Sequence, residues 1–197
     1  MIEYENSAEI LNMDFDLIIP FEFHVNETGI RIVAYDVLKD IAEEFKDKFK
    51  LDYFADAAFD YLFENIKPYT DKWGYTVDIK HLYTWGYSYH INKINTDVIL
   101  DTTVKHENMF VTMIDKNIVS FAEEHSGEIG VETDINYQNR GYGASNVAAL
   151  AKYLADMNIT ATYYCDSYNT ASQRLAEKVG FVVKSKDYSY YCYKNGE

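Results

Sequence analysis

The order of strands and helices in the second half of the sequence limits the fold more than any other feature. Apolar residues alternate within three segments that short turns separate, which predicts antiparallel strands over residues 110–114, 118–122 and 128–133. Residues 143 to about 157 then carry an apolar face at helical spacing, and residues 159–165 alternate again. A strand–helix–strand unit after an antiparallel meander predicts a mixed α/β sheet.

The chain continues with a second helix after Asn169, and Gly180 is placed to end it. Two short strands, 181–183 and 188–193, are expected to close the fold. These elements, with the three strands before them, define a core domain over residues 106–197.

The first half of the sequence, residues 1–105, is less regular. It predicts one strand, interrupted by a proline, and two helices, the second of which should stop before Pro68 because the residue before a proline disfavours helix. These elements lie at 15–25, 34–49 and from about 52. Alternation at Tyr75, Val77 and Ile79 indicates a further strand, but the order of elements in residues 67–105 stays open.

Composition narrows the class of partner. The 197 residues carry 18 Lys and Arg against 32 Asp and Glu, a formal net charge of −14. Nucleic acid is not expected as a partner, because phosphate backbones need a basic surface, whereas an acidic protein can attract a cationic amine. No secretion signal and no membrane-length apolar run are evident, and we expect a cytoplasmic protein without membrane contact.

The cysteines and histidines do not predict a metal site. Cys165 and Cys192 are too few for a disulfide framework or a metal-ligand set, and the five histidines lack the spacing of metal ligands. We therefore expect two free buried thiols and no metal.

A glycine-containing turn, Gln138–Ala144, lies between a predicted strand and a predicted helix. Gly141 and Gly143 allow a sharp turn and a close approach of the backbone, and the first turn of the helix has unpaired N–H groups at the positive end of its dipole. This arrangement suits a pyrophosphate. A plain turn is the alternative interpretation.

The segment Gln138-Asn139-Arg140-Gly141-Tyr142-Gly143-Ala144 resembles the Gln/Arg-x-x-Gly-x-Gly/Ala signature of the GNAT superfamily of N-acetyltransferases. The segment from Asn169 to Gly180-Phe181 is similar to the second conserved block of that superfamily. The resemblance covers roughly residues 107 to 197. It implies a splayed, mostly antiparallel sheet flanked by helices, acetyl-CoA as co-substrate, and an N-acetyltransferase.

The resemblance also implies which residues hold acetyl-CoA. The strand 128–133 should splay from the strand 159–165 and bind the pantetheine arm through its backbone, while backbone N–H groups of the glycine turn hold the pyrophosphate. The expected binding residues are Val131, Thr133, Gln138, Asn139, Arg140, Gly141, Tyr142, Gly143, Ala144 and Asn169. Gly130 could mark a bulge in this strand, or it could be an ordinary strand residue.

The catalytic residues are harder to assign. Glu128 and Glu132 are candidates for the general base, with a solvated surface position as the alternative for each. Relatives in this superfamily often place a thiolate-protonating Tyr seven residues after the Asn of the second block, but this chain has Ala176 there. The ribosomal-protein N-terminal acetyltransferases are similar at Asn169-x-x-Ser172, which implies Ser172 as the candidate partner of the thiolate. The alternative for Ser172 is a helix residue that bonds its own backbone. Three tyrosines could replace the missing one, namely Tyr163, Tyr164 and Tyr168.

The resemblance implies transfer of an acetyl group to an amine of a small molecule or a peptide N-terminus by direct attack in a ternary complex. Loss of the usual Tyr leaves one alternative, a non-catalytic acyl-CoA sensor or interaction protein on the same scaffold. A homodimer through a sheet edge is compatible with the resemblance.

Overall fold

The computed structural model describes residues 1–195 and divides the chain into two compact units. The first unit is Met1–Gly86 together with the chain after Lys184, and the second unit is Tyr87–Lys184. The division between residues 105 and 106 expected from the sequence differs from this, because residues 87–105 are part of the second unit and the last segment of the chain returns to the first.

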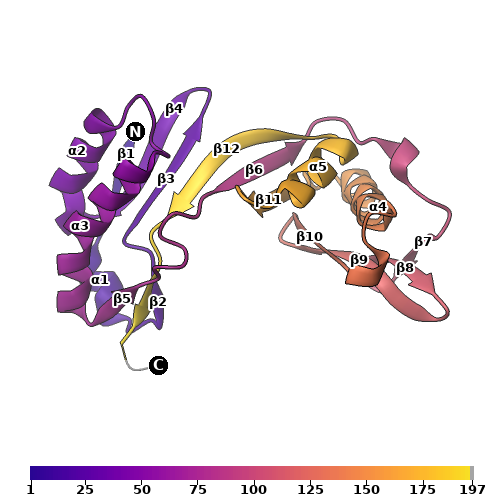
Figure 1. Cartoon of the computed structure of the whole chain (residues 1–197), viewed down its shortest axis with the longest axis horizontal. Helices are drawn as coiled ribbons and strands as arrows, with labels where there is room; N and C mark the ends of the chain where they lie inside the picture. Colours follow the sequence, from indigo (N-terminus) through magenta and orange to yellow (C-terminus); the bar gives the residue numbers. More distant parts are fainter. Residues whose placement is uncertain (196–197) are drawn as a thin grey trace. The chain divides into compact units, whose positions relative to one another are not determined.

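The first unit contains two sheets (Figure 1). The strand order in the larger one is β1-β4-β3-β12, with β1 parallel to β4 and the other neighbours antiparallel. These strands are β1 (Ile2–Glu5), β3 (Phe21–Asn26), β4 (Gly29–Tyr35) and β12 (Phe181–Ser189). The smaller sheet has the order β2-β13-β5 and consists of β2 (Leu17–Ile18), β5 (Tyr75–Val77) and β13 (Cys192–Lys194).

Three of the strands depart from expectation. Pro20 divides the strand expected over 15–25 into β2 and β3, which lie in different sheets, because a proline cannot donate to a ladder. At the other end of the chain, β12 is one continuous strand where the sequence predicts a break between residues 183 and 188.

The helices of the first unit are α1 (Ser7–Asn12), α2 (Lys39–Lys48) and α3 (Asp56–Trp73), with a 3-10 turn at Asp36–Leu38. The helix expected over 34–49 begins later, because Ala34 is part of β4 and packs inward from that strand. Helices α2 and α3 cover one face of the larger sheet (Figure 1).

The prediction that the second helix stops before Pro68 is wrong. Helix α3 continues through Pro68 and ends at Gly74, whose φ of 84° is left-handed. Pro68 is exposed, so the carbonyl that loses its helical hydrogen bond can be solvated. Ile66 and Thr70 on either side are fully buried and hold both halves of the helix against the core.

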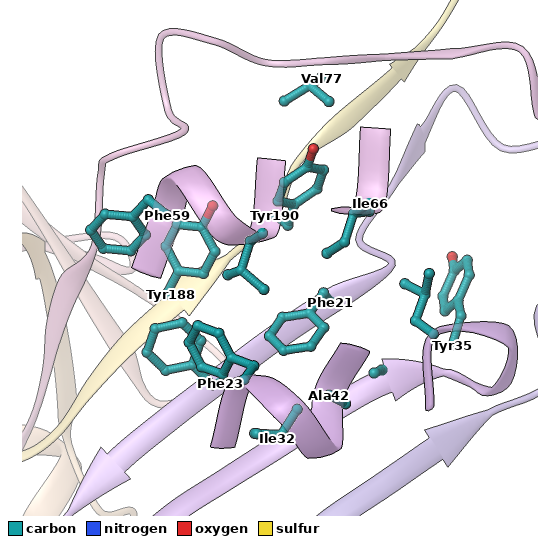
Figure 2. Packing of buried hydrophobic residues seen from close by; sticks show 14 of the residues in the cluster. Phe21, Phe23, Ile32, Tyr35, Ala42, Phe59, Ile66, Val77, Tyr188 and Tyr190 are labelled. Atoms are coloured by element: carbon teal, nitrogen blue, oxygen red, sulfur yellow. The ribbon is translucent and has the colours of Figure 1, made fainter. Parts of the chain in front are cut away.

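The core of the first unit is rich in aromatic rings. Phe23 contacts Phe45 and Tyr188 with ring centroids 5.2 Å apart in each pair, and Phe59 lies 4.9 Å from Tyr188. Figure 2 shows Tyr188 and Tyr190 among these buried rings, next to Ile66. The two tyrosines are two residues apart on the end of β12 and just after it, and they face the same side.

Strands of the second unit follow the order β12-β6-β11-β10-β9-β8-β7. They are β6 (Gly86–Ile91), β7 (Thr103–His106), β8 (Met109–Ile114), β9 (Asn117–His125), β10 (Glu128–Thr133) and β11 (Thr162–Asp166). The antiparallel meander β8-β9-β10 confirms the sequence prediction, and its turns have the left-handed residues that tight hairpins require at Lys116 and Gly127.

Two helices pack side by side in the second unit, α4 (Tyr142–Asp156) and α5 (Thr170–Val179) (Figure 1). Both agree with the predicted ranges, and α5 ends at Gly180 with a φ of 108°. Short 3-10 turns lie at Thr96–Val98 and Ile135–Tyr137. The mixed α/β sheet with flanking helices is the expected fold class. Within residues 1–195, no helix is both long and apolar enough to span a membrane.

The hydroxyl groups of Tyr188 and Tyr190 are buried without a hydrogen-bond partner in the described chain. A buried hydroxyl without a partner destabilises a fold by about 1–3 kcal/mol. We therefore expect Tyr190→Phe to raise the free energy of unfolding by about 1 kcal/mol in urea titration. Tyr75→Phe is the matched control, since the Tyr75 hydroxyl donates to the carbonyl of Phe15 at 2.6 Å and its loss should destabilise. A loss of stability in both variants would contradict the expectation.

Candidate functional site

A cavity of about 440 Å³ opens in the second unit beside the start of α4. It is lined by residues of β10, the turn before α4, β11 and α5. The lining residues are Val131, Thr133, Tyr137, Gln138, Asn139, Gly141, Tyr142, Gly143, Ala144, Tyr163, Asn169, Ala171, Ser172, Arg174, Leu175 and Lys178.

The two parallel strands β10 and β11 open toward this cavity. Their register pairs Glu128 with Thr162, at the beginning of both strands. Further along, Val131 and Thr133 of β10 and Tyr163 of β11 line the cavity instead of forming a continuous ladder. The splay that the sequence resemblance implies is therefore present, with β11 as the partner.

Residues of the turn before α4 line the cavity. Asn139 has a φ of 60° and Gly141 a φ of 85°, so two left-handed residues are separated by one residue. Such turns form concave anion sites from successive N–H groups. Gly141 is the N-cap of α4 and makes no side-chain cap, and the first intrahelical bond runs from the Ser145 N–H to the Gly141 carbonyl. The N–H groups of the first turn therefore remain for a ligand.

Gly143 has a different role from Gly141. Its φ is ordinary, but a Cβ at this position would lie 3.1 Å from Leu175 Cδ1, 3.2 Å from Thr133 Oγ1 and 3.5 Å from Val131 Cγ2. Glycine therefore allows the first turn of α4 to pack directly on β10 and α5. The position of the N–H groups depends on this contact.

A buried hydrogen-bond network holds the beginning of α4 against the neighbouring strands. Asn146 Oδ1 accepts from the hydroxyls of Thr103 and Thr112 at 3.0 and 3.1 Å, and its amide donates to Ser120 Oγ at 3.1 Å. Ser120 Oγ in turn lies 2.8 Å from Thr133 Oγ1, which lines the cavity. Asn146 is fully buried and its hydrogen bonds are satisfied, so the network holds α4 in one register against β10.

Both charged residues among the described residues that line the cavity are cations. Arg174 and Lys178 lie four residues apart on α5, so they share one face of the helix. The side chain of Arg140 is not among the lining residues; it donates to the Asn136 carbonyl at 3.1 Å and lies 5.0 Å from the centre of the Tyr137 ring. The Gln138 side chain donates to the Thr133 carbonyl at 3.3 Å and ties the turn to β10.

At the other side of the cavity, the start of α5 carries a hydrogen-bonded pair. Asn169 caps the helix, its Oδ1 accepting from the Ser172 N–H at 3.1 Å, so its amide nitrogen is the group that could reach a ligand. The Ser172 hydroxyl lies 2.6 Å from the Tyr163 hydroxyl, and both residues line the cavity. Burial raises the pKa of Tyr163, although the hydrogen bond to Ser172 opposes this shift.

Cys165 is buried and does not line the cavity. Burial raises the pKa of its thiol, while hydrogen bonds with Ser172 and Tyr89 act in the opposite direction. The thiol is therefore protonated at neutral pH, in line with the expected unreactive cysteine.

The candidate bases Glu128 and Glu132 do not line the cavity. Both are exposed on the face of β10 opposite Val131 and Thr133, as alternation in a regular strand requires. Of the two interpretations of Gly130, the ordinary strand residue is the one observed, because β10 pairs with β9 one to one from Glu128 to Thr133. The irregularity lies instead between Thr112 and Met113 of β8.

Nine of the ten expected binding residues and the two candidates Ser172 and Tyr163 line one cavity, and five further lining residues were not predicted. Arg174 and Lys178 could have been found from their helical spacing beside the second block. Tyr163 was one of three equivalent tyrosines, and no sequence signal separates it from the others. The remaining missed residues are Tyr137, Ala171 and Leu175.

Comparison with known proteins agrees with the geometry. Residues 116–190 match the model of the family described as FR47-like protein, which is related to the GNAT superfamily. The resemblance to the GNAT superfamily is confirmed. No curated protein matches the chain in sequence.

Solved structures align with this chain at low sequence identity. A Drosophila protein aligns with a TM-score of 0.52 and 12% identity over 69% of this chain and 58% of its own. A protein from Novosphingobium aromaticivorans described as a GNAT-family acetyltransferase aligns with a TM-score of 0.48 and 14% identity, over 62% of this chain and 68% of its own. A GCN5-related N-acetyltransferase-like protein from Streptococcus suis aligns with a TM-score of 0.45 and 17% identity, over 71% of this chain and 69% of its own.

The packing role of Gly143 can be measured. Gly143→Ala should lower the free energy of unfolding by about 1–3 kcal/mol, because the added methyl group overpacks the contact of α4 with Thr133 and Leu175. Gly130→Ala is the matched control, since a Cβ there meets nothing within 4 Å, and its stability should equal or slightly exceed that of the wild type. Equal stability of both variants in urea titration would show that the contact is not tight.

Proposed function

We propose that the protein is an N-acetyltransferase that moves an acetyl group from acetyl-CoA to an amine. The observation that carries the proposal is the cavity at the start of α4, which combines a concave turn of N–H groups with Arg174 and Lys178. In a chain of net charge −14, this is a local positive site for an anion.

The diphosphate of the co-substrate would be held by the backbone from Asn139 to Ala144. Left-handed φ values at Asn139 and Gly141 turn consecutive N–H groups toward the cavity, and the dipole of α4 adds positive charge there. Arg174 and Lys178 extend this positive field along α5 and suit further phosphate oxygens.

The arm that carries the acetyl group would enter the gap between β10 and β11. Val131 and Thr133 line one side of the gap and Tyr163 the other, and the backbone edge of β10 toward β11 can bond amide groups. The co-substrate supplies an activated thioester. A backbone N–H near Val131 would stabilise the oxyanion that forms when the carbonyl is attacked.

The acceptor amine would approach from the opposite face of β10. Glu128 and Glu132 are exposed there, and Glu123 lies on the same face because it is directly opposite Gly130 in the register with β9. Three carboxylates on one face favour a cationic amine, and Glu128 or Glu132 could take its proton before attack. An amine in a small molecule or at a peptide N-terminus fits this chemistry equally.

The proposed anion binding by the turn predicts how one substitution changes the affinity for acetyl-CoA. Asn139→Asp should weaken acetyl-CoA binding at least tenfold in isothermal calorimetry, because it adds a negative charge where phosphate binds, with little effect on stability since Asp tolerates a left-handed φ. Asn158→Asp is the matched control; Asn158 also has a φ of 60° but lies outside the cavity. Equal affinity in the two variants would contradict phosphate binding at this turn.

Acetyl transfer is tested by the release of CoA thiol from acetyl-CoA in the presence of an amine panel of polyamines, aminoglycosides and short peptides. Turnover with at least one amine, abolished by Asn139→Asp and retained by Asn158→Asp, is the expected result. Tight binding of acetyl-CoA without turnover on any amine would support a non-catalytic acyl-CoA sensor instead. Absence of binding would exclude both functions.

A further inference from the structure

The hydrogen-bonded pair of Tyr163 and Ser172 stands out among the residues that line the cavity. Tyr163 comes from β11 and Ser172 from the first turn of α5, and their hydroxyl oxygens are 2.6 Å apart. Both side chains line the cavity, so the pair lies at the end of the gap in which the thioester sulfur is expected.

Of the three tyrosines near the second block, Tyr163 alone lies in the cavity. Its side chain is 3% exposed, whereas Tyr164 and Tyr168 are 42% and 68% exposed and are not among the lining residues. The ring of Tyr163 is held between Phe181, at 5.6 Å between centroids, and Tyr89, at 6.4 Å. A buried ring held on two sides presents its hydroxyl in one direction.

Either hydroxyl can be the donor in this contact. A phenol is a stronger acid than an aliphatic alcohol, which favours the Tyr163 O–H as the donor and Ser172 Oγ as the acceptor. Asn169 also holds the Ser172 backbone through its N–H. The Ser172 hydroxyl proton can then point either to Cys165, with which Ser172 also forms a hydrogen bond, or to a group in the cavity, at the positive end of the α5 dipole.

We propose that Tyr163 is the positioning residue that orients the Ser172 hydroxyl toward the departing thiolate of coenzyme A. The inference rests on the proposed acetyl transfer. When the amine nitrogen bonds to the acetyl carbon, the carbon–sulfur bond breaks and its electron pair stays on sulfur. Sulfur takes the Ser172 proton, Ser172 regains a proton that the amine nitrogen has released through water, and Tyr163 keeps its own.

The position of Ala176 explains why the chain uses a residue from β11. Ala176 is fully buried in the cluster that contains Tyr89, Tyr163 and Phe181, and it does not line the cavity. A tyrosine at 176 would overpack this cluster. The ring of Tyr163 enters from the facing strand and brings its hydroxyl to Ser172 instead.

The test uses the thiol of bound CoA, which needs no acceptor amine. The pKa of this thiol is measured from the ultraviolet absorbance of the thiolate as pH rises. A hydroxyl that donates to sulfur stabilises the thiolate and lowers the thiol pKa, so Tyr163→Phe and Ser172→Ala should each raise it by about one unit, with the Kd of CoA within twofold of wild type. Tyr164→Phe is the control and should leave the thiol pKa unchanged.

Activity gives a second, independent readout. Tyr163→Phe should lower kcat about tenfold with KM for acetyl-CoA unchanged. The double variant should lose no more than Ser172→Ala alone, because the two residues act as one unit. An unchanged thiol pKa in Tyr163→Phe, or additive losses in the double variant, would overturn the inference while wild-type transfer still stood. Failure of the wild type to bind CoA would overturn the proposed function itself.

Discussion

Close packing of the first turn of α4 on β10 is the constraint on which the rest of the site depends. Gly143 brings the helix within contact of Val131 and Thr133, and Asn146 links the next turn to Ser120 and thereby to β10. The N–H groups at the helix start are therefore fixed relative to the strand that lines the cavity. Without that contact, the start of the helix and the gap between β10 and β11 would not stay at a fixed separation.

Much of the second unit could be predicted from its sequence because its signals are local. Turn residues separate β8, β9 and β10, Gly180 ends α5, and the glycine turn lies between a strand and a helix. In the first unit the deciding interactions join distant segments. Helix α3 continues through Pro68 because buried neighbours hold it, and β13 pairs with both β2 and β5, which no local pattern indicates.

The binding part of the site was more predictable than the catalytic part. The proposed binding uses backbone groups, and glycine spacing indicates where a backbone can approach a ligand. Catalytic side chains depend on which face of a strand they occupy. Regular pairing of β10 with β9 places Glu128 and Glu132 away from the cavity, and a difference of one position on β11 separates buried Tyr163 from exposed Tyr164. The face of a strand on which a side chain lies depends on strand pairing across the whole sheet, which a local sequence pattern does not show.

Strand β12 has a consequence for the order in which the chain folds during its synthesis. The second unit is one continuous segment, Tyr87–Lys184, and can complete its contacts as soon as that segment has left the ribosome. The first unit begins earlier in the chain but lacks most of strand β12 of its larger sheet and the middle strand of its smaller one until the residues after 184 emerge. The unit that is synthesised first is therefore the one that completes its folding last. Until then the aromatic residues of its core remain exposed, and chaperones can bind them.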